Sequence, residues 1–230
     1  MAKKGYIKAD DTGGQFDRVA VGYDFMESLF HNNDFFLSWM PRNRNRALDI
    51  GCGSGIMASA LAGSFVEVVG VDISQAMLDI AKRLRNLPNI RYLKLDAVEL
   101  PEGEKYDYIV SRTTFHHIDD IPSLLRRLQK MLNPEGRIVI LDCAWKENVR
   151  HQAWYRVFPF MEALKNAFRI GLSATWKVFR FRLSKPWLDH LASDRYMTAD
   201  EFREVYSCAL PGCQIGWHEC FMYVVWDNPS

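Results

Sequence analysis

The stretch Ala47-Leu48-Asp49-Ile50-Gly51-Cys52-Gly53-Ser54-Gly55 decides the fold of this 230-residue chain. Its first four residues form a short, mostly apolar strand, and the glycines let the backbone turn sharply and a ligand approach closely. Open α/β sheets bind ligands at such a junction between a strand and a helix. Ile56 stands where a dinucleotide fingerprint has its third glycine, and the Asp49 carboxylate would repel a pyrophosphate. The stretch therefore predicts a site for a ligand without phosphate.

Strands and helices alternate on both sides of this loop. Strands are predicted at 47–50, 66–71, 90–95, 106–110, 137–141, 214–216 and 218–226. Helices are predicted at 16–40, 56–62, 75–85, 121–132 and 199–208, with Ser74 and Thr198 as N-caps and a turn at 133–136. Short apolar strands that alternate with helices indicate a parallel sheet buried on both faces. We expect an α/β fold, a Rossmann-like, mostly parallel seven-stranded sheet with an antiparallel C-terminal strand.

The chain divides into four expected regions: an N-terminal helical lid segment (1–45), a cofactor-binding core (46–142), a helical cap (143–190), and a C-terminal helix and hairpin that complete the sheet (191–230). The cap is aromatic and basic, with nine Lys and Arg against three Asp and Glu. Such a lid suits an acidic or amphipathic acceptor, and Trp154 and Arg156 are candidate substrate contacts. A solvated helix face above an aromatic core would give the same pattern.

Three acids end three successive predicted strands, at Asp49, Asp72 and Asp96. Each matches a different part of an adenosyl amino acid: Asp49 the ammonium group, Asp72 the ribose hydroxyls, and Asp96 the adenine amino group, with the backbone of Ala97 as a donor. The alternative is that these acids are helix caps or turn residues. The set predicts a site for S-adenosylmethionine.

Two further motifs are Phe16-Asp17-x-x-Ala20-x-x-Tyr23-Asp24 and Met131-Leu132-Asn133-Pro134-Glu135-Gly136-Arg137. With the glycine loop and the three acids, they resemble the class I S-adenosylmethionine-dependent methyltransferases, over about 16–142 and the C-terminal hairpin. Within that group the core is similar to the quinone-biosynthesis C-methyltransferases and their small-molecule relatives. The resemblance implies a cofactor site that includes Tyr23 as its cover and, along its walls, Asp49, Gly51, Gly53, Asp72, Ile73, Asp96, Ala97 and Ser111. Residues 143–190 do not share the resemblance, so the substrate is not carried over.

The segment 111–117 follows the fourth strand, and in this family it lies beside the sulfonium and faces the acceptor. His116 or His117 could serve as a base or could orient the acceptor, since imidazole titrates near neutrality. Arg112 could pair with the cofactor carboxylate or with an anionic substrate, and Phe115 is a further candidate contact. No metal is expected, although His116, His117 and Asp119 could hold one. Cys208, Cys213, His218 and Cys220 match no compact zinc pattern.

The expected function is methyl transfer from S-adenosylmethionine, with S-adenosylhomocysteine as product, to an oxygen of a small-molecule or peptide acceptor, an ionised carboxylate included. The alternatives are C-methylation of a quinone-like substrate, a non-catalytic module that binds the cofactor, and a nicotinamide-dependent oxidoreductase. A net charge of +1 gives no argument for nucleic acid or membrane partners. The polar N-terminus lacks a signal peptide, no apolar run could span a bilayer, and five scattered cysteines favour the reducing cytoplasm. A monomer or a homodimer is expected.

Overall fold

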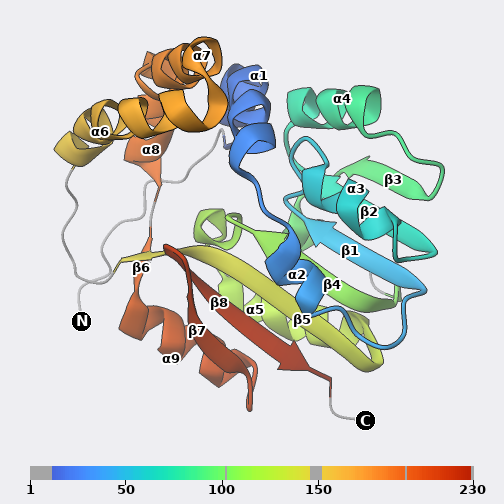
Figure 1. The fold of residues 1–230 in the computed structure, drawn as a ribbon. Helices are drawn as coiled ribbons and strands as arrows, with labels where there is room; N and C mark the ends of the chain where they lie inside the picture. Colours follow the sequence, from blue (N-terminus) through green and yellow to red (C-terminus); the bar gives the residue numbers. More distant parts are fainter. Residues whose placement is uncertain (1–11, 102, 146–151, 195, 229–230) are drawn as a thin grey trace.

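A computed structural model describes residues 12–101, 103–145, 152–194 and 196–228, with the backbone alone over 152–156. Its central sheet has the strand order β3-β2-β1-β4-β5-β8-β7, and β6 pairs with β5 beside this path (Figure 1). The strands are β1 (Arg46–Ile50), β2 (Glu67–Asp72), β3 (Ile90–Lys94), β4 (Tyr106–Arg112), β5 (Leu132–Trp145), β6 (Met197–Thr198), β7 (Gln214–His218) and β8 (Phe221–Asp227). The strands β1 to β5 pair in parallel, and β8 runs antiparallel to β5 and β7. The expected Rossmann-like sheet with an antiparallel C-terminal strand is confirmed.

Helices cover both faces of this sheet. They are α1 (Thr12–Phe30), α2 (Asp34–Ser38), α3 (Ile56–Ala62), α4 (Gln75–Leu84), α5 (Ile121–Met131), α6 (Gln152–Ile170), α7 (Leu172–Arg182), α8 (Lys185–Ser193) and α9 (Ala199–Ala209), with 3₁₀ turns η1 (Ala97–Glu99) and η2 (Phe115–His117). Alternation along each strand separates two cores. Leu48 and Ile50 of β1 pack with α5 and α9, whereas Ala47 packs with α2, α3 and α4 on the other face. The carboxyl ends of β1 to β4 are thus fixed between two helical layers.

The predicted N-caps are present in the structure. The Ser74 hydroxyl accepts a hydrogen bond from the Met77 backbone N–H. Thr198 forms a capping box with Glu201 at the start of α9. These caps fix the first turns of α4 and α9.

The N-terminal segment differs from the single helix expected at 16–40. It forms α1 and α2, which are separated at residues 31–33. The side-chain oxygen of Asn32 accepts a hydrogen bond from the backbone N–H of Asp34 at 2.7 Å. Asparagine side chains compete with the helical backbone in this way. The break lets α1 lie along the rim of the sheet while α2 packs on its face.

The turn expected at 133–136 is instead an irregular part of β5. The register between β4 and β5 shifts between Tyr106 and Tyr108, and Glu135 takes a positive φ of 60°. A Cβ at Gly136 would lie 2.9 Å from the carbonyl oxygen of Asn133. The strand therefore accommodates the extra residues as a bulge that only glycine can close.

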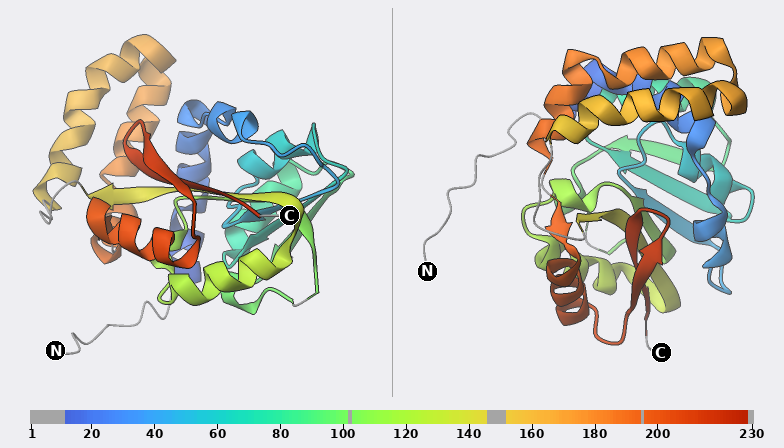
Figure 2. Two further views of the ribbon diagram at one scale, coloured as in Figure 1. Left: turned by 90° about the horizontal axis from the view of Figure 1, so that it is seen from below. Right: turned by 60° about the vertical axis from the view of Figure 1, so that its left-hand side comes forward.

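The cap consists of α6, α7 and α8, which lie beside α1 and away from α5 and α9 (Figure 2). The approach is close at Gly22 of α1, where an added Cβ would lie 2.2 Å from the Phe181 ring of α7. None of the helices in the described ranges is both long and apolar enough to cross a membrane. The cap is therefore seated on the helix that also borders the carboxyl ends of the strands.

Candidate active site

A cavity of about 740 Å³ opens at the carboxyl ends of β1, β2, β3 and β4, under α1. Many of the residues predicted to bind cofactor or substrate lie in its wall: Tyr23, Gly51, Gly53, Asp72, Ile73, Asp96, Ala97, Arg112 and His117. A smaller hollow of about 50 Å³ adjoins it and is lined by Asp49. The two spaces share Tyr23, Gly51, Gly53, Arg112 and Thr113. The three strand-end acids thus line two adjoining spaces.

Asp49 is the last residue but one of β1 and is buried, with 2% of its surface exposed. Its Oδ2 atom is buried and has no hydrogen-bond partner within the described parts of the chain. Burial raises the pKa of Asp49 to about 7, and the charge of Asp72 adds to this, while a hydrogen bond from the Ala58 backbone N–H opposes it. A buried carboxylate without a partner is costly, so this oxygen fits a cationic ligand. The ammonium group of an amino acid would supply the missing donor.

Asp72 ends β2 and turns its carboxylate toward the glycine loop. Its Oδ2 accepts from the Gly53 backbone N–H and its Oδ1 from the Ser74 backbone N–H, both at 2.8 Å. Burial raises the pKa of Asp72, and these two hydrogen bonds oppose the rise. The Ile73 backbone N–H is a further donor to Asp72. An ionised carboxylate offers about four lone-pair sites, so acceptor capacity remains for a ligand hydroxyl.

Asp96 combines the two roles that the sequence left open. Its Oδ1 accepts from the Val98 backbone N–H and caps η1. The same side chain is exposed and lines the large cavity together with Ala97. The cap holds the carboxylate in place without using all its acceptor sites.

The glycine loop leaves room where a ligand would enter. Gly53 has a φ of 51°, and an ideal Cβ on it would have no heavy atom within 4 Å. The position therefore faces open space, and any other residue would be strained there. A ligand could therefore come close to the backbone of the glycine loop at this position.

Tyr23 of α1 covers the junction between the two spaces. Burial foremost, and then Glu27, raise the pKa of Tyr23, while a hydrogen bond with the Thr113 side chain opposes the rise. The phenol is therefore neutral and fixed against Thr113, a residue with a positive φ of 50°. Its ring lies 5.7 Å from that of Trp187, which joins this cover to α8 of the cap.

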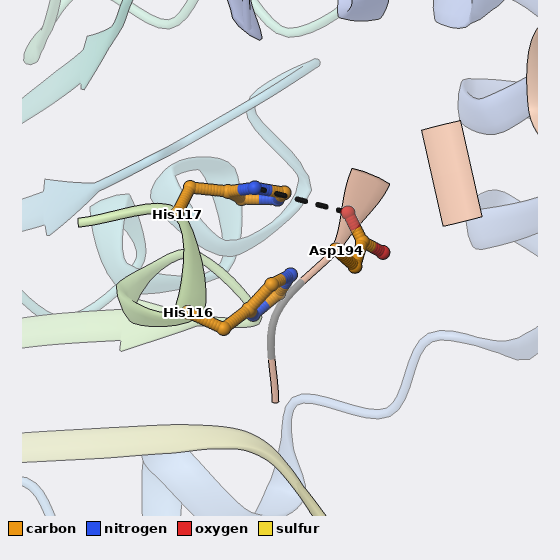
Figure 3. Close-up of side chains that lie close together, drawn as sticks. All are labelled: His116, His117 and Asp194. Atoms are coloured by element: carbon orange, nitrogen blue, oxygen red, sulfur yellow. Dashed lines mark ion pairs between the residues drawn. The ribbon is translucent and has the colours of Figure 1, made fainter. Parts of the chain in front are cut away.

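His116, His117 and Asp194 converge where η2 meets the residue after α8 (Figure 3). The Nδ1 of His116 lies 2.6 Å from Oδ1 of Asp142, and that of His117 lies 3.9 Å from Oδ1 of Asp194. Burial lowers the pKa of His116, but the charge and hydrogen bond of Asp142 outweigh it and raise the pKa above its usual value. Burial, His116 and His190 lower the pKa of His117 to about 2.

Among the described residues, these three side chains form a group that could hold a metal ion, because their ligand atoms lie within 4.8 Å of one another. It contains Asp194 where the sequence suggested Asp119. The Nδ1 atom of His116 is already paired with Asp142, so this ring has only its Nε2 atom left for a further partner. The cluster therefore fits a polar contact between core and cap, and the expectation of no metal requirement stays a prediction.

Two of the candidate site residues, Ser111 and Phe115, lie away from the cavity. Ser111 is buried and donates its hydroxyl to the Ile50 carbonyl at 2.8 Å, which supports the glycine loop from below. Phe115 is fully buried and packs toward Tyr206 in the core, because η2 turns its ring inward. The side chains of Trp154 and Arg156 lie outside the described residues.

His116 is also absent from the cavity wall, since Asp142 holds its ring from behind. The expectation that either histidine could face the acceptor therefore narrows to His117.

Other wall residues were missed by the sequence reasoning. Glu27 and His31 line the Asp49 hollow and form a pair at 3.0 Å. With Tyr23 they recur every four residues, which places them on one side of α1. Asp17 accepts from the Ser74 hydroxyl at 2.6 Å and lines the large cavity. The four-residue spacing from Tyr23 was the available signal for Glu27 and His31, whereas Asp17 does not follow it.

A family model described as a methyltransferase domain matches residues 23–170. The chain is 33% identical over 137 residues to a ubiquinone biosynthesis O-methyltransferase of Bartonella tribocorum, covering 57% of this chain and 56% of that protein. It is 28% identical over 186 residues to a demethylmenaquinone methyltransferase of Lactobacillus johnsonii, covering 73% and 76%. A 2-phytyl-1,4-naphtoquinone methyltransferase of Synechococcus elongatus is 34% identical over 151 residues, covering 59% and 65%.

Two solved structures share the fold. A chain from the complex of a methyltransferase with the Haloferax volcanii Trm112 methyltransferase activator matches with a TM-score of 0.64, 16% identity, and coverage of 96% of this chain and 100% of that chain. Phosphoethanolamine N-methyltransferase 2 of Haemonchus contortus, in complex with phosphomonomethylethanolamine and S-adenosylhomocysteine, has a TM-score of 0.64, 21% identity, and coverage of 92% and 47%. The chain belongs to the methyltransferase-domain family, within the class I S-adenosylmethionine-dependent methyltransferases, and its core resembles the quinone-biosynthesis group.

Proposed function

We propose that the protein methylates an oxygen atom of a small acidic or amphipathic acceptor. S-adenosylmethionine supplies the methyl group on a positively charged sulfur and leaves as S-adenosylhomocysteine. The observation that carries the proposal is the ring of His117, which lies in the cavity wall with its Nε2 atom buried and without a hydrogen-bond partner among the residues that the structure describes.

The walls of the two spaces suit the separate parts of the cofactor. Asp49 and Arg112 border the small hollow together, so they offer opposite charges to the ammonium and carboxylate groups of an amino acid. Asp72 and Asp96 border the large cavity and would hold the ribose and the adenine. We therefore assign Arg112 to the cofactor rather than to the acceptor.

The low pKa of His117 narrows the class of acceptor. A ring with a pKa of about 2 is a neutral imidazole at neutral pH, so one of its nitrogens is free of hydrogen and accepts a hydrogen bond. It can orient an acceptor hydroxyl, yet it is too weak a base to ionise an aliphatic alcohol. The acceptor would therefore be one that ionises readily by itself, such as a phenol or a carboxylic acid. Alignment and exclusion of water would then supply most of the rate.

A pH–rate profile tests this role. With a phenolic acceptor, the rate should follow ionisation of the phenol, and His117→Gln should lower kcat/KM by about tenfold or less without changing the profile. A general base would contribute about 10²- to 10⁴-fold. A loss of that size, with the pH profile altered in the variant, would contradict the orienting role. His218→Gln, outside the cavity wall, is the matched control.

C-methylation of a quinone-like substrate is the second candidate, since relatives at 28% and 34% identity are named as a demethylmenaquinone methyltransferase and a 2-phytyl-1,4-naphtoquinone methyltransferase. A methyl-¹³C cofactor separates the two, because an O-methyl and a C-methyl carbon have different chemical shifts. If the protein binds S-adenosylhomocysteine but produces none with phenolic, carboxylic or quinone acceptors, a non-catalytic module is favoured. The five cysteines are free, which fits the reducing cytoplasm that we propose as its location.

A further inference from the structure

The cap carries an apolar face that nothing among the described residues covers. Its side chains come from α6 and α7, and each is more than half exposed: Phe160, Met161, Leu164, Phe168, Leu172 and Trp176. The extremes are Phe168 at 87% and Leu172 at 80%. We call these six residues the outer cap face. Isolated exposed apolar residues are ordinary, but a contiguous set marks an interaction surface.

Spacing and ring contacts make the outer cap face continuous. Met161, Leu164 and Phe168 follow one another at intervals of three and four, so they lie on one side of α6. On α7, Trp176 stacks on Phe179 with ring centroids 5.7 Å apart. Phe179 in turn meets Phe160 of α6 edge-on at 4.9 Å. The apolar sides of the two helices therefore join.

The other side of the same helices is already used by the protein. Asn166, Thr175 and Val178 are buried, and the Arg182 guanidinium packs 6.0 Å from the ring of Phe30 in α1. The cap is therefore held to α1 by one side and exposes the other. Figure 2 shows α6 and α7 as an outer layer of the molecule.

Cations border the outer cap face. Lys165 of α6 and Arg180 of α7 are exposed, whereas Glu162 is half-buried. Arg169 and Lys177 face α1 instead, with their charged groups over the rings of Phe30 and Phe25. Aromatic and aliphatic side chains edged by Lys and Arg are the composition of helices that lie in the interface of an anionic bilayer. A second copy of the chain fits less well, because a two-fold contact through this face would bring the cations of both copies together.

We propose that the outer cap face docks the protein on the surface of an anionic lipid bilayer. The apolar side chains enter the region between headgroups and acyl chains, and the bordering cations meet the lipid phosphates. Docking involves no chemical step and is independent of the methyl acceptor. It orients the molecule with the cap toward the lipid and α5 and α9 toward the solvent.

Sedimentation of the full-length protein with vesicles tests the proposal. We expect binding to vesicles of equal parts phosphatidylcholine and phosphatidylglycerol, and weaker binding to phosphatidylcholine alone or at high salt. The double variant Phe168→Ser/Leu172→Ser should weaken binding by about a hundredfold, because two large apolar side chains no longer leave water. The double variant Lys165→Glu/Arg180→Glu should weaken it by about tenfold or more, and most at low salt.

Matched controls lie elsewhere on the surface. Val66 is 73% exposed before β2, and Arg126 is exposed on α5, so Val66→Ser and Arg126→Glu should bind vesicles as the wild type does. Unchanged circular dichroism and melting temperature would show that the cap variants fold. The proposal is overturned if the wild type ignores anionic vesicles, or if both cap variants bind as the controls do. It is also overturned if light scattering shows a dimer that Phe168→Ser/Leu172→Ser dissociates.

Discussion

Replacing Asp49 by Asn should stabilise the protein in the absence of cofactor. Burial and the neighbouring charge of Asp72 raise the pKa of Asp49 from 3.8 to about 7. In the unfolded chain the group ionises near 3.8, so between that pH and about 7 the folded protein holds more protons. The free energy of unfolding therefore decreases as the pH rises through this window, and the full cost is present above pH 7.

The magnitude follows from the displacement of the pKa. At 1.36 kcal/mol per unit, a pKa of about 7 instead of 3.8 corresponds to an upper limit of about 4 kcal/mol. Water that enters the adjoining hollow would reduce this, so we expect Asp49→Asn to gain about 2 kcal/mol at pH 8. The gain should vanish below pH 4, where Asp49 is protonated in both states. Asparagine keeps an oxygen for the Ala58 N–H.

Denaturant unfolding at pH 4 and pH 8 measures this effect, and a gain of about 2 kcal/mol corresponds to a rise of about 4–8 °C in Tm. S-adenosylhomocysteine should raise the Tm of the wild type more than that of the variant, because its ammonium group would pair with the carboxylate. A variant that is less stable than the wild type at pH 8 would refute the reasoning. So would a gain of equal size at both pH values.

Three further predictions concern the cap and the His116 cluster. Gly22→Ala should displace the Phe181 ring, which would lie 2.2 Å from the new Cβ. The free energy of unfolding should decrease by about 1–2 kcal/mol, after the gain in helix propensity is included. Hydrogen exchange should become faster in α7, and unchanged exchange there would contradict the close packing of the cap on α1. Asp142→Asn should cost about 3 kcal/mol in urea unfolding, since it removes one partner of a buried pair with His116 at 2.6 Å; a near-neutral effect would show that the pair is dispensable. Below pH 6.5 the unfolded chain binds a proton at His117 that the folded ring, with its pKa of about 2, does not bind, so the free energy of unfolding decreases as the pH falls. His117→Gln should reduce this decrease by about 1.4 kcal/mol per pH unit; an identical pH dependence in wild type and variant would contradict the lowered pKa.

Local patterns in the sequence were enough to predict the strands of the sheet and the acidic residues at their ends. The helix predicted at 56–62 has the observed bounds of α3, and Ser74 and Thr198 cap the helices as expected. These features depend on residues close together in the chain, where hydrophobic period and capping chemistry act directly. The strand ends followed, and with them the positions of Asp49, Asp72 and Asp96.

Features set by distant contacts were not predictable in the same way. The direction of a side chain just after a strand depends on the turn that follows, and η2 turns Phe115 into the core. The partners of His116 and His117 lie at Asp142 and Asp194, far along the sequence. No periodic pattern links such residues, so the sequence could not separate His117 from His116.

The break after α1 was missed for a related reason. Hydrophobic spacing continued across residues 31–33, whereas the Asn32 side-chain oxygen accepts a hydrogen bond from the Asp34 backbone N–H, where α2 begins. The residues that border the Asp49 hollow from the side of α1 recur at four-residue intervals in the sequence. Their role could not be inferred until the position of α1 over the strands was known.

Calorimetric titration with two ligands tests most directly whether the strand-end acids divide the cofactor among them. S-adenosylhomocysteine carries the amino acid group, and 5′-methylthioadenosine lacks it while keeping ribose and adenine. Asp49→Asn should weaken S-adenosylhomocysteine binding by about ten- to a hundredfold and leave methylthioadenosine binding unchanged, whereas Asp72→Asn should weaken both. Equal losses for the two ligands in Asp49→Asn, or no loss of either in Asp72→Asn, would contradict the assignment.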